Sequence, residues 1–148
     1  RSPQKYALIV PGGSGKRLNK RIPVKLFFEI ISMLIEKKIT PFLIGSIDDL
    51  SICKKIEKRF PGIKNLCLKT NFFDIASLAK NAFFSIGNDT GPMHIISRAN
   101  KKTIVLFTEN SDPKLCGPIG EKVEILKINQ NEEEFRNKVL QKTKKAIS

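Results

Sequence analysis

The chain has 148 residues, of which 41% are hydrophobic. That is enough to fill the core of one domain and leaves little room for two, so we expect residues 1–148 to form a single domain. The 27 Lys and Arg side chains outnumber the 14 Asp and Glu, and the formal net charge of +13 attracts nucleic acid, anionic membrane surfaces or phosphorylated small molecules. No aromatic-rich RNA-binding sequence, zinc-finger spacing or helix-turn-helix pattern accompanies this charge, which disfavours nucleic acid as the partner.

The cysteines and the apolar runs indicate a cytosolic protein. Cys53, Cys67 and Cys116 are odd in number and form no C-x-x-C pair, so we expect reduced, mostly buried thiols rather than a disulfide framework or a zinc site. No apolar run approaches the ~18 residues of a membrane span, and no signal peptide opens the chain. Because the chain begins with Arg1 and runs almost at once into a strand, we interpret it as a piece of a longer protein.

The first predicted strand, Tyr6–Val10, is followed by a loop rich in glycine and cations. This loop fits neither common phosphate-binding motif. A Walker A loop would need Gly where Val10 stands and Ser or Thr where Arg17 stands, and the dinucleotide fingerprint would need Gly in place of Leu18. Two interpretations remain: a flexible loop whose amides, hydroxyl and cations approach a phosphate, or an ordinary solvated loop.

Strands and helices alternate along the rest of the chain. Apolar residues recur in adjacent pairs every four residues from Leu26 to Ile35, which predicts a helix from Pro23 to about Lys38. The alternation predicts an α/β fold, a Rossmann-like parallel sheet with helices on both faces, whose ligands bind beyond the carboxyl ends of the strands. Further strands are expected over Pro41–Ile44, Asn65–Leu68, Phe83–Ile86, Thr103–Phe107 and Val123–Ile128, and further helices over Ile52–Phe60, Phe72–Ala82 and Asn131–Lys145.

Polar residues stand at the starts of two of these helices. Asn71 and Asp74 are spaced like a capping box. Asp48 and Asp49 open the preceding helix, where negative charge suits the helix dipole. The functional alternative is that one of these carboxylates accepts the hydroxyls of a ribose at the carboxyl edge of the sheet.

The chemistry of the chain concentrates in the turn after the strand Phe83–Ile86. Gly87 to Gly91 breaks that strand, and Pro92 suits the first turn of a helix. Asp89 or Thr90 can cap the amides just behind it. The turn therefore aims free N–H groups and the positive end of a helix at the space above the sheet, which suits phosphate. The alternative is an ordinary strand-to-helix turn.

His94 follows Gly91 by three residues, about one helical turn, and could therefore face the same space. The residues of this turn read Gly-Asn-Asp-Thr-Gly-Pro-Met-His, which resembles the G-N-D-[ST]-G-P-M-H signature of glycosyltransferase family 9, the lipopolysaccharide heptosyltransferases. The resemblance runs in order from about Tyr6 to Leu126. It implies a two-domain GT-B architecture, of which this chain would be the C-terminal, nucleotide-sugar-binding half without the N-terminal acceptor domain.

The loop after the first strand also resembles the family. Its residues match P-G-x-S followed by K-x-W-P, which implies that Gly13 and Ser14 contact the donor and that Lys20 meets the phosphate of the donor. The sequence departs from the family pattern where Val10, Ile22 and Leu68 replace the family's His, Trp and Gly.

Two later segments complete the implied donor site. Asp49, and less closely Asp48, falls near a Glu of the family that touches the ribose. The family motif assigns donor binding to the side chain of Asp89, diphosphate contacts to the backbone of Thr90 and Gly91, and its histidine to His94.

The resemblance implies a glycosyltransferase that needs no metal or other cofactor. Backbone amides, a helix N-terminus and Lys20 would stabilise the nucleoside diphosphate as it leaves, while a base in the N-terminal half would activate the acceptor hydroxyl for inverting transfer. The implied partners are a nucleoside-diphosphate sugar and a lipopolysaccharide-type acceptor, bound through the missing domain. The implied location is cytoplasmic, with peripheral contact to the anionic inner face of the inner membrane.

Two interpretations from other functional classes remain open. One is a Rossmann-like nucleotide-binding module with a regulatory rather than a transfer role. The other is a basic adaptor for an anionic membrane or nucleic acid. Saturable binding of a nucleoside diphosphate at one site would separate the adaptor from the other two.

Overall fold

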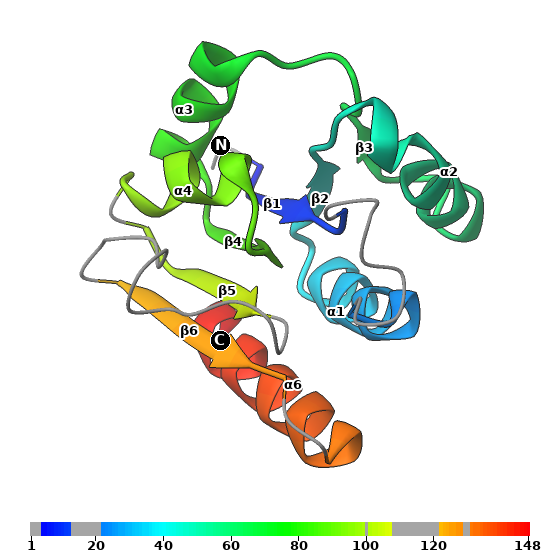
Figure 1. Ribbon diagram of the computed structural model, residues 1–148, viewed down its shortest axis with the longest axis vertical. Helices are drawn as coiled ribbons and strands as arrows, with labels where there is room; N and C mark the ends of the chain where they lie inside the picture. The colour runs from blue at the N-terminus through cyan, green and yellow to red at the C-terminus, as the bar shows by residue number, and fades with distance from the viewer. Residues whose placement is uncertain (1–3, 13–21, 100, 108–121, 129–130) are drawn as a thin grey trace.

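The computed structural model describes residues 4–12, 22–99, 101–107, 122–128 and 131–148. These residues form a sheet of six parallel strands in the order β3-β2-β1-β4-β5-β6 (Figure 1). The chain adds β2 and β3 on one side of β1 and then β4, β5 and β6 on the other side, so the strand order reverses between β1 and β4. The strands are β1 (Tyr6–Val10), β2 (Thr40–Leu43), β3 (Lys64–Asn65), β4 (Phe84–Asn88), β5 (Thr103–Phe107) and β6 (Val123–Lys127). The helices are α1 (Val24–Glu36), α2 (Leu50–Arg59), α3 (Phe72–Asn81), α4 (Gly91–Ser97) and α6 (Glu132–Ile147), with a short 3₁₀ turn η2 (Ile47–Asp49). The fold class expected from the sequence is confirmed.

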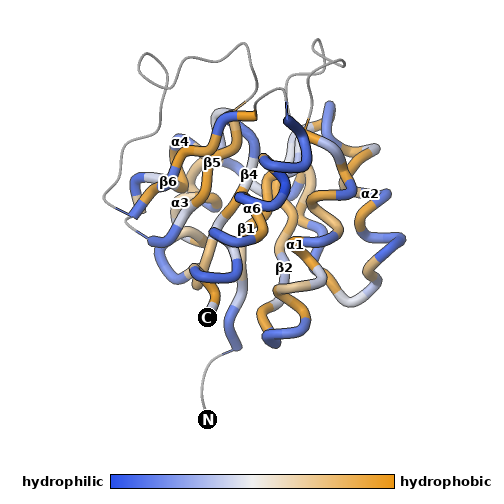
Figure 2. The backbone as a smooth tube through the Cα atoms, turned by 90° about the horizontal axis from the view of Figure 1, so that it is seen from below, coloured by the Kyte–Doolittle hydropathy of each residue, from blue (hydrophilic) through white to orange (hydrophobic). Residues whose placement is uncertain are grey.

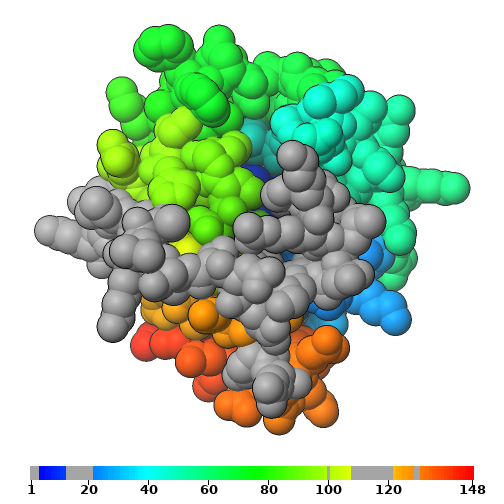
Figure 3. All heavy atoms as spheres, in the orientation of Figure 1, coloured from blue at the N-terminus to red at the C-terminus, as the bar shows by residue number. Residues whose placement is uncertain are grey.

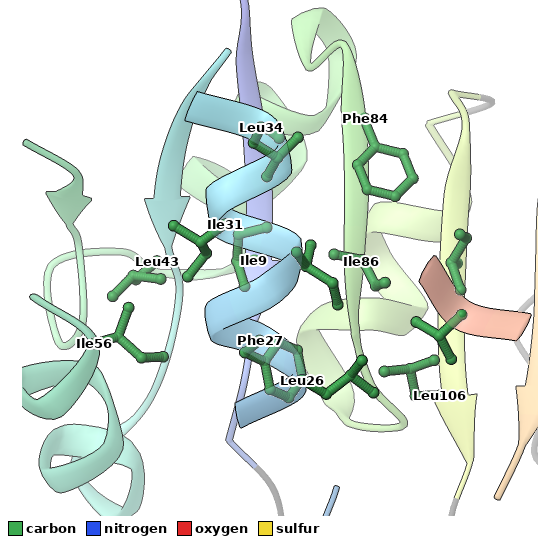
Figure 4. Packing of buried hydrophobic residues seen from close by; sticks show 14 of the residues in the cluster. Ile9, Leu26, Phe27, Ile31, Leu34, Leu43, Ile56, Phe84, Ile86 and Leu106 are labelled. Carbon is green, nitrogen blue, oxygen red and sulfur yellow. The ribbon is translucent and has the colours of Figure 1, made fainter. Parts of the chain in front are cut away.

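Helices cover the sheet on both faces. Ala7 and Ile9 of β1 pack into the cluster that holds α1, α2 and α6, whereas Leu8 and Val10 pack into the cluster that holds α3 and α4. The apolar stripe of α1 lies over the centre of the sheet, where Figure 4 shows its side chains against those of β1, β2 and β4. None of the described helices is long and apolar enough to cross a membrane. In Figure 2 the C-terminus and the first described residues before β1 lie at the same end of the sheet, where the strands begin.

Two of the predicted strands have different bounds in the structure. The strand expected over Asn65–Leu68 ends at Asn65, where the Oδ1 atom of Asn65 accepts a hydrogen bond from the amide of Cys67 (3.0 Å). The amides of Leu66 and Leu68 still donate to the carbonyls of Leu43 (2.9 Å) and Gly45 (3.0 Å), so the chain stays beside β2 without regular strand pairing. Leu68 then adopts a left-handed conformation (φ 66°), the conformation that favours the glycine of the family pattern. The strand expected to end at Ile86 instead continues through Asn88, because its pairing with β1 and β5 continues that far.

The predicted helix starts at Asn71 and Asn131 are confirmed. The Asn71 side chain accepts a hydrogen bond from the amide of Asp74 (2.8 Å), and the Asp74 carboxylate accepts one from the amide of Asn71 (2.9 Å). Asn131 accepts from the amide of Glu134 (3.0 Å) at the start of α6. Both helices therefore begin where the sequence indicates.

Two of the three cysteines lie within the described residues. Cys53 and Cys67 are free and buried, as expected, whereas Cys116 lies outside the described residues. Burial raises the pKa of the Cys53 thiol, and the neighbouring Cys67 raises that pKa further. Burial also raises the pKa of Cys67, whose thiol donates to the carbonyl of Ser46 (3.3 Å). Both side chains therefore remain neutral thiols at physiological pH.

The C-terminal end of α1 places a lysine where glycine is usual. Lys38 has φ 60°, its amide donates to the carbonyl of Ile35 (2.9 Å), and the next amide, that of Ile39, donates to Leu34 (2.9 Å). This is the Schellman arrangement, in which the left-handed residue after the helix is most often glycine.

We predict that Lys38→Gly stabilises the protein. Relief of the left-handed conformation is worth ~1–2 kcal/mol, and the greater freedom of glycine in the unfolded chain offsets about half of it, so the free energy of unfolding should rise by ~0.5–1 kcal/mol. Urea unfolding should show a higher midpoint at an unchanged slope. Lys37→Gly is the control, because Lys37 has φ −87° and glycine relieves nothing there. An equal rise in both variants would contradict the argument.

Candidate functional site

A hollow of about 360 Å³ lies at the carboxyl ends of β1, β2 and β4. In Figure 3 it is the recess between the cyan η2–α2 segment and the green start of α4, with the blue end of β1 at its base. Its position is the point where the strand order reverses, which is where open α/β sheets bind ligands. The hollow, called the switch pocket below, is lined by Val10, Ser46, Asp48, Asp49, Asp89, Thr90, Gly91 and Pro92.

The β4–α4 turn supplies one wall of the switch pocket. The amide of Asp89 still donates to β5, at the carbonyl of Leu106 (3.0 Å), and Thr90 takes the N-cap position of α4 in an extended conformation. The expected side-chain cap is absent at this helix start, because the Thr90 hydroxyl donates instead to the carbonyl of Asn88 (3.3 Å). The amides of Thr90 and Gly91 have no partner among the described residues. This is expected, because the first amides of a helix have no carbonyl partner within the helix.

Asp89 connects the switch pocket to His94. The Asp89 Oδ1 atom lies 3.3 Å from the Nε2 atom of His94, within ion-pair range, yet no hydrogen bond of adequate geometry reaches this buried oxygen within the described chain. The expectation that His94 faces the same space as the turn needs correction. His94 is absent from the described lining of the switch pocket and instead borders a separate groove of about 550 Å³ between α3 and α4, with Lys80 and Arg98. Its recorded contact with the lining of the switch pocket is the one to Asp89.

The η2 turn supplies the opposite wall. Asp49 is buried, and its Oδ2 atom accepts hydrogen bonds from the amide (2.8 Å) and the hydroxyl (3.1 Å) of Ser46. One oxygen of Asp49 therefore holds the turn, as the helix-start interpretation of this residue predicts. Asp48 is exposed and also lines the pocket. The two carboxylates thus lie where a ribose could meet them, but only Asp48 is free of a structural hydrogen bond among the described residues.

Asn88 is the residue that the sequence analysis missed. Its Nδ2 atom donates to the carbonyls of Pro11 (2.9 Å) and Gly12 (3.1 Å), and so ties the exit of β1 to the end of β4. The side chain is buried, and its Oδ1 atom has no partner among the described residues. Its place between a strand glycine and Asp89 was the available signal, since a buried amide there can bond to two backbones at once.

Gly12 lies directly against Asp49. A Cβ atom at Gly12 would stand 1.9 Å from the Asp49 Oδ1 atom and 2.1 Å from its carboxyl carbon. The exit of β1 and the η2 turn can therefore approach each other only because residue 12 has no side chain.

Three of the predicted site residues lie outside the described residues. These are Gly13, Ser14 and Lys20, and their contacts with a donor stay predictions. Within the described residues, no group of three or more His, Cys, Asp or Glu side chains could hold a metal ion.

We predict that Gly12→Ala destabilises the protein by roughly 1–3 kcal/mol, because the new methyl group must displace the carboxylate that holds η2. Thermal or urea unfolding measures this loss. Gly91→Ala is the matched control in the same pocket, since no atom lies within 4 Å of the position of its Cβ, and it should change stability by less than about 0.5 kcal/mol. Equal losses in the two variants would show that the contact with Asp49 does not constrain this site.

Comparison with known proteins shows similarity to glycosyltransferases. The model of glycosyltransferase family 9 (heptosyltransferase) matches residues 1–146. Lipooligosaccharide heptosyltransferase 2 of Haemophilus influenzae is 28% identical over 118 residues, which cover 76% of this chain and 34% of that protein.

Solved structures show the same fold. Escherichia coli ADP-heptose lipopolysaccharide heptosyltransferase II superimposes with a TM-score of 0.82 at 20% identity, over 99% of this chain and 47% of that one. E. coli heptosyltransferase WaaC with ADP gives a TM-score of 0.80 at 22% identity, over 96% of this chain and 44% of that one. The chain thus spans less than half the length of these relatives. The match of the family model over nearly the whole sequence shows that this chain belongs to glycosyltransferase family 9, the heptosyltransferases.

Proposed function

We propose that this chain is the C-terminal, donor-binding part of an inverting glycosyltransferase that transfers a heptose-like sugar from a nucleoside diphosphate during synthesis of the lipopolysaccharide core. The observation that carries the proposal is the switch pocket, which joins free amides and carboxylates at the carboxyl ends of the strands. Relatives of the same fold include an E. coli heptosyltransferase solved with ADP and with ADP-2-deoxy-2-fluoro heptose. The donor proposed for this chain is therefore of the ADP-heptose type.

The two walls of the switch pocket suit different parts of such a donor. Carboxylates accept hydrogen bonds from hydroxyl groups, so Asp48 and Asp49 on the η2 wall suit a ribose. The amides of Thr90 and Gly91 donate, so the α4 wall suits the oxygens of a diphosphate. Asp89 also lines the pocket and is assigned to the hydroxyls of the donor.

Leaving-group stabilisation is assigned to Lys20 together with the amides of the turn. The diphosphate gains negative charge as the sugar departs, and fixed donors aimed at that charge lower the barrier. The proposal routes no step through a metal ion or another cofactor. The acceptor and its base belong to the N-terminal half implied by the family resemblance. The net charge of +13 supports contact with an anionic membrane at the cytoplasmic face, where the acceptor would lie, and the lack of a nucleic-acid-binding motif in the sequence disfavours nucleic acid.

We predict that the chain binds ADP or ADP-heptose at one site and that Lys20→Ala weakens this binding. Loss of one charge-assisted contact corresponds to roughly 1.5–3 kcal/mol, and binding of the bare nucleoside should be unaffected because the charge acts on phosphate. Titration calorimetry with ADP and adenosine measures both. Lys25→Ala, an exposed lysine on α1, is the control of equal charge. No heat with any nucleoside diphosphate would overturn the proposed function.

We predict that the chain alone transfers no sugar. Holding the acceptor against the anomeric carbon, with a base beside its hydroxyl, can supply ~7–11 kcal/mol of barrier lowering. Asp89 lines the switch pocket but is assigned to the donor, and His94 borders the α3–α4 groove instead. Transfer of labelled sugar to heptose-deficient lipopolysaccharide precursor should therefore require the chain extended by the N-terminal half. Comparable turnover by the chain alone would place the base within these 148 residues.

A further inference from the structure

A second cavity lies at the amino ends of the strands, opposite the switch pocket at their carboxyl ends. It has a volume of about 370 Å³ and opens between the amino ends of β5 and β6 and the C-terminal end of α6. The buried side chains of Phe84 and Ile104 form its floor, and four lysines stand around it: Lys102, Lys122, Lys142 and Lys145. Figure 2 shows the C-terminus at the end of the sheet where the strands begin. We call it the lysine cavity.

Local contacts fix two of these lysines. The Lys102 Nζ atom donates to the carbonyl of Ala146 (3.1 Å), and the Lys142 Nζ atom lies 3.2 Å from the Oε2 atom of Glu124. Lys122 and Lys145 form no ion pair within the part of the chain that the structure describes. Among the described residues, the lining of the cavity therefore holds four lysines and one carboxylate, that of Glu124.

The four ammonium groups repel one another unless an anion is present. Like charges that surround one cavity repel, and that repulsion falls when a bound anion supplies the missing negative charge. A phosphate monoester carries between one and two negative charges near neutral pH and has three strong acceptor oxygens. It can accept charge-assisted hydrogen bonds from several ammonium groups at once. The apolar floor offers a surface for the carbon part of the same molecule.

We propose that the lysine cavity is a second anion site, separate from the donor pocket, and that it binds the phosphate group of a phosphorylated ligand. Two sources share this chemistry: a soluble phosphate monoester and the headgroup of an anionic lipid. The site stands on residues that take no part in the proposed donor binding. Its test is therefore independent of the proposed transferase function.

The test follows the backbone amides of isotope-labelled protein by NMR. Glycerol 3-phosphate should shift the amides around the lysine cavity, at Thr103, Val123 and Ala146, in a saturable way. ADP, titrated separately, reports on the amides of Thr90 and Gly91 and so on the donor site. Failure of one titration leaves the result of the other standing.

The decisive variant is Lys122→Gln/Lys145→Gln. Both lysines are exposed and without ion pairs among the described residues, so the fold should survive, with an unchanged unfolding midpoint. Binding of glycerol 3-phosphate at the cavity should weaken at least tenfold, because two charge-assisted contacts are lost, each weakened by solvent screening at these exposed positions. The matched control is Lys138→Gln/Lys144→Gln, which removes the same charge from exposed positions of α6 outside the cavity and should retain binding.

Vesicles separate the two sources. The protein is sedimented with phosphatidylcholine vesicles that contain phosphatidic acid. If the cavity variant loses this sedimentation and the control keeps it, the site binds a lipid headgroup. Cavity shifts with glycerol 3-phosphate but no such sedimentation assign it to a soluble ligand. The proposal is overturned if neither probe binds at the cavity, or if both double variants lose binding equally, since the effect would then come from net charge alone.

Discussion

The close approach of the ends of β1 and β4 is the constraint on which the switch pocket depends. Val10 pairs with Gly87 in the sheet. A Cβ atom at Gly87 would stand 2.5 Å from the Val10 Cβ atom and 2.9 Å from the Met93 sulfur. Glycine at this position therefore lets Met93 of α4 rest on the sheet beside β1. A larger residue would lift the start of α4, and with it the two free amides, away from the pocket.

Asn88 secures this junction at a cost. Its amide joins two carbonyls that lie 76 and 77 residues earlier in the chain, while its own carbonyl oxygen is buried without a partner among the described residues. An unpaired buried acceptor costs about 1–3 kcal/mol. The fold tolerates this cost at the one place where the exit of β1, the end of β4 and the start of α4 must keep a fixed geometry. Such a local loss of stability is typical of binding sites.

The sequence predicted most of the fold because its strands are short apolar runs and its helices carry strong stripes and caps. It failed where long-range contacts decide. The motif from Gly87 to Gly91 has the composition of a turn, yet β1 and β5 supply hydrogen-bond partners that extend the strand through Asn88. The family resemblance implied a ribose contact for Asp49, and Asp49 does line the pocket, but one of its oxygens already accepts hydrogen bonds from Ser46. The direction of His94 also depends on packing, since its ring lies between the groove beside α3 and the carboxylate of Asp89. Periodicity places a residue on a helix but does not tell which of two neighbouring spaces it faces.

The charges of the switch pocket would give the proposed donor a preferred direction. The protein as a whole is strongly basic, and its field draws an anion in, but at physiological salt that field is screened beyond about 8 Å. Inside the pocket the local groups decide. Asp48 and Asp49 have no cationic partner among the described residues, so the η2 wall repels phosphate and accepts hydroxyls. Asp89 has one oxygen against the imidazole of His94, and free amides stand beside it, so the α4 wall is the less negative of the two. A nucleoside diphosphate bound as proposed would therefore gain most by turning its ribose toward η2 and its phosphates toward α4.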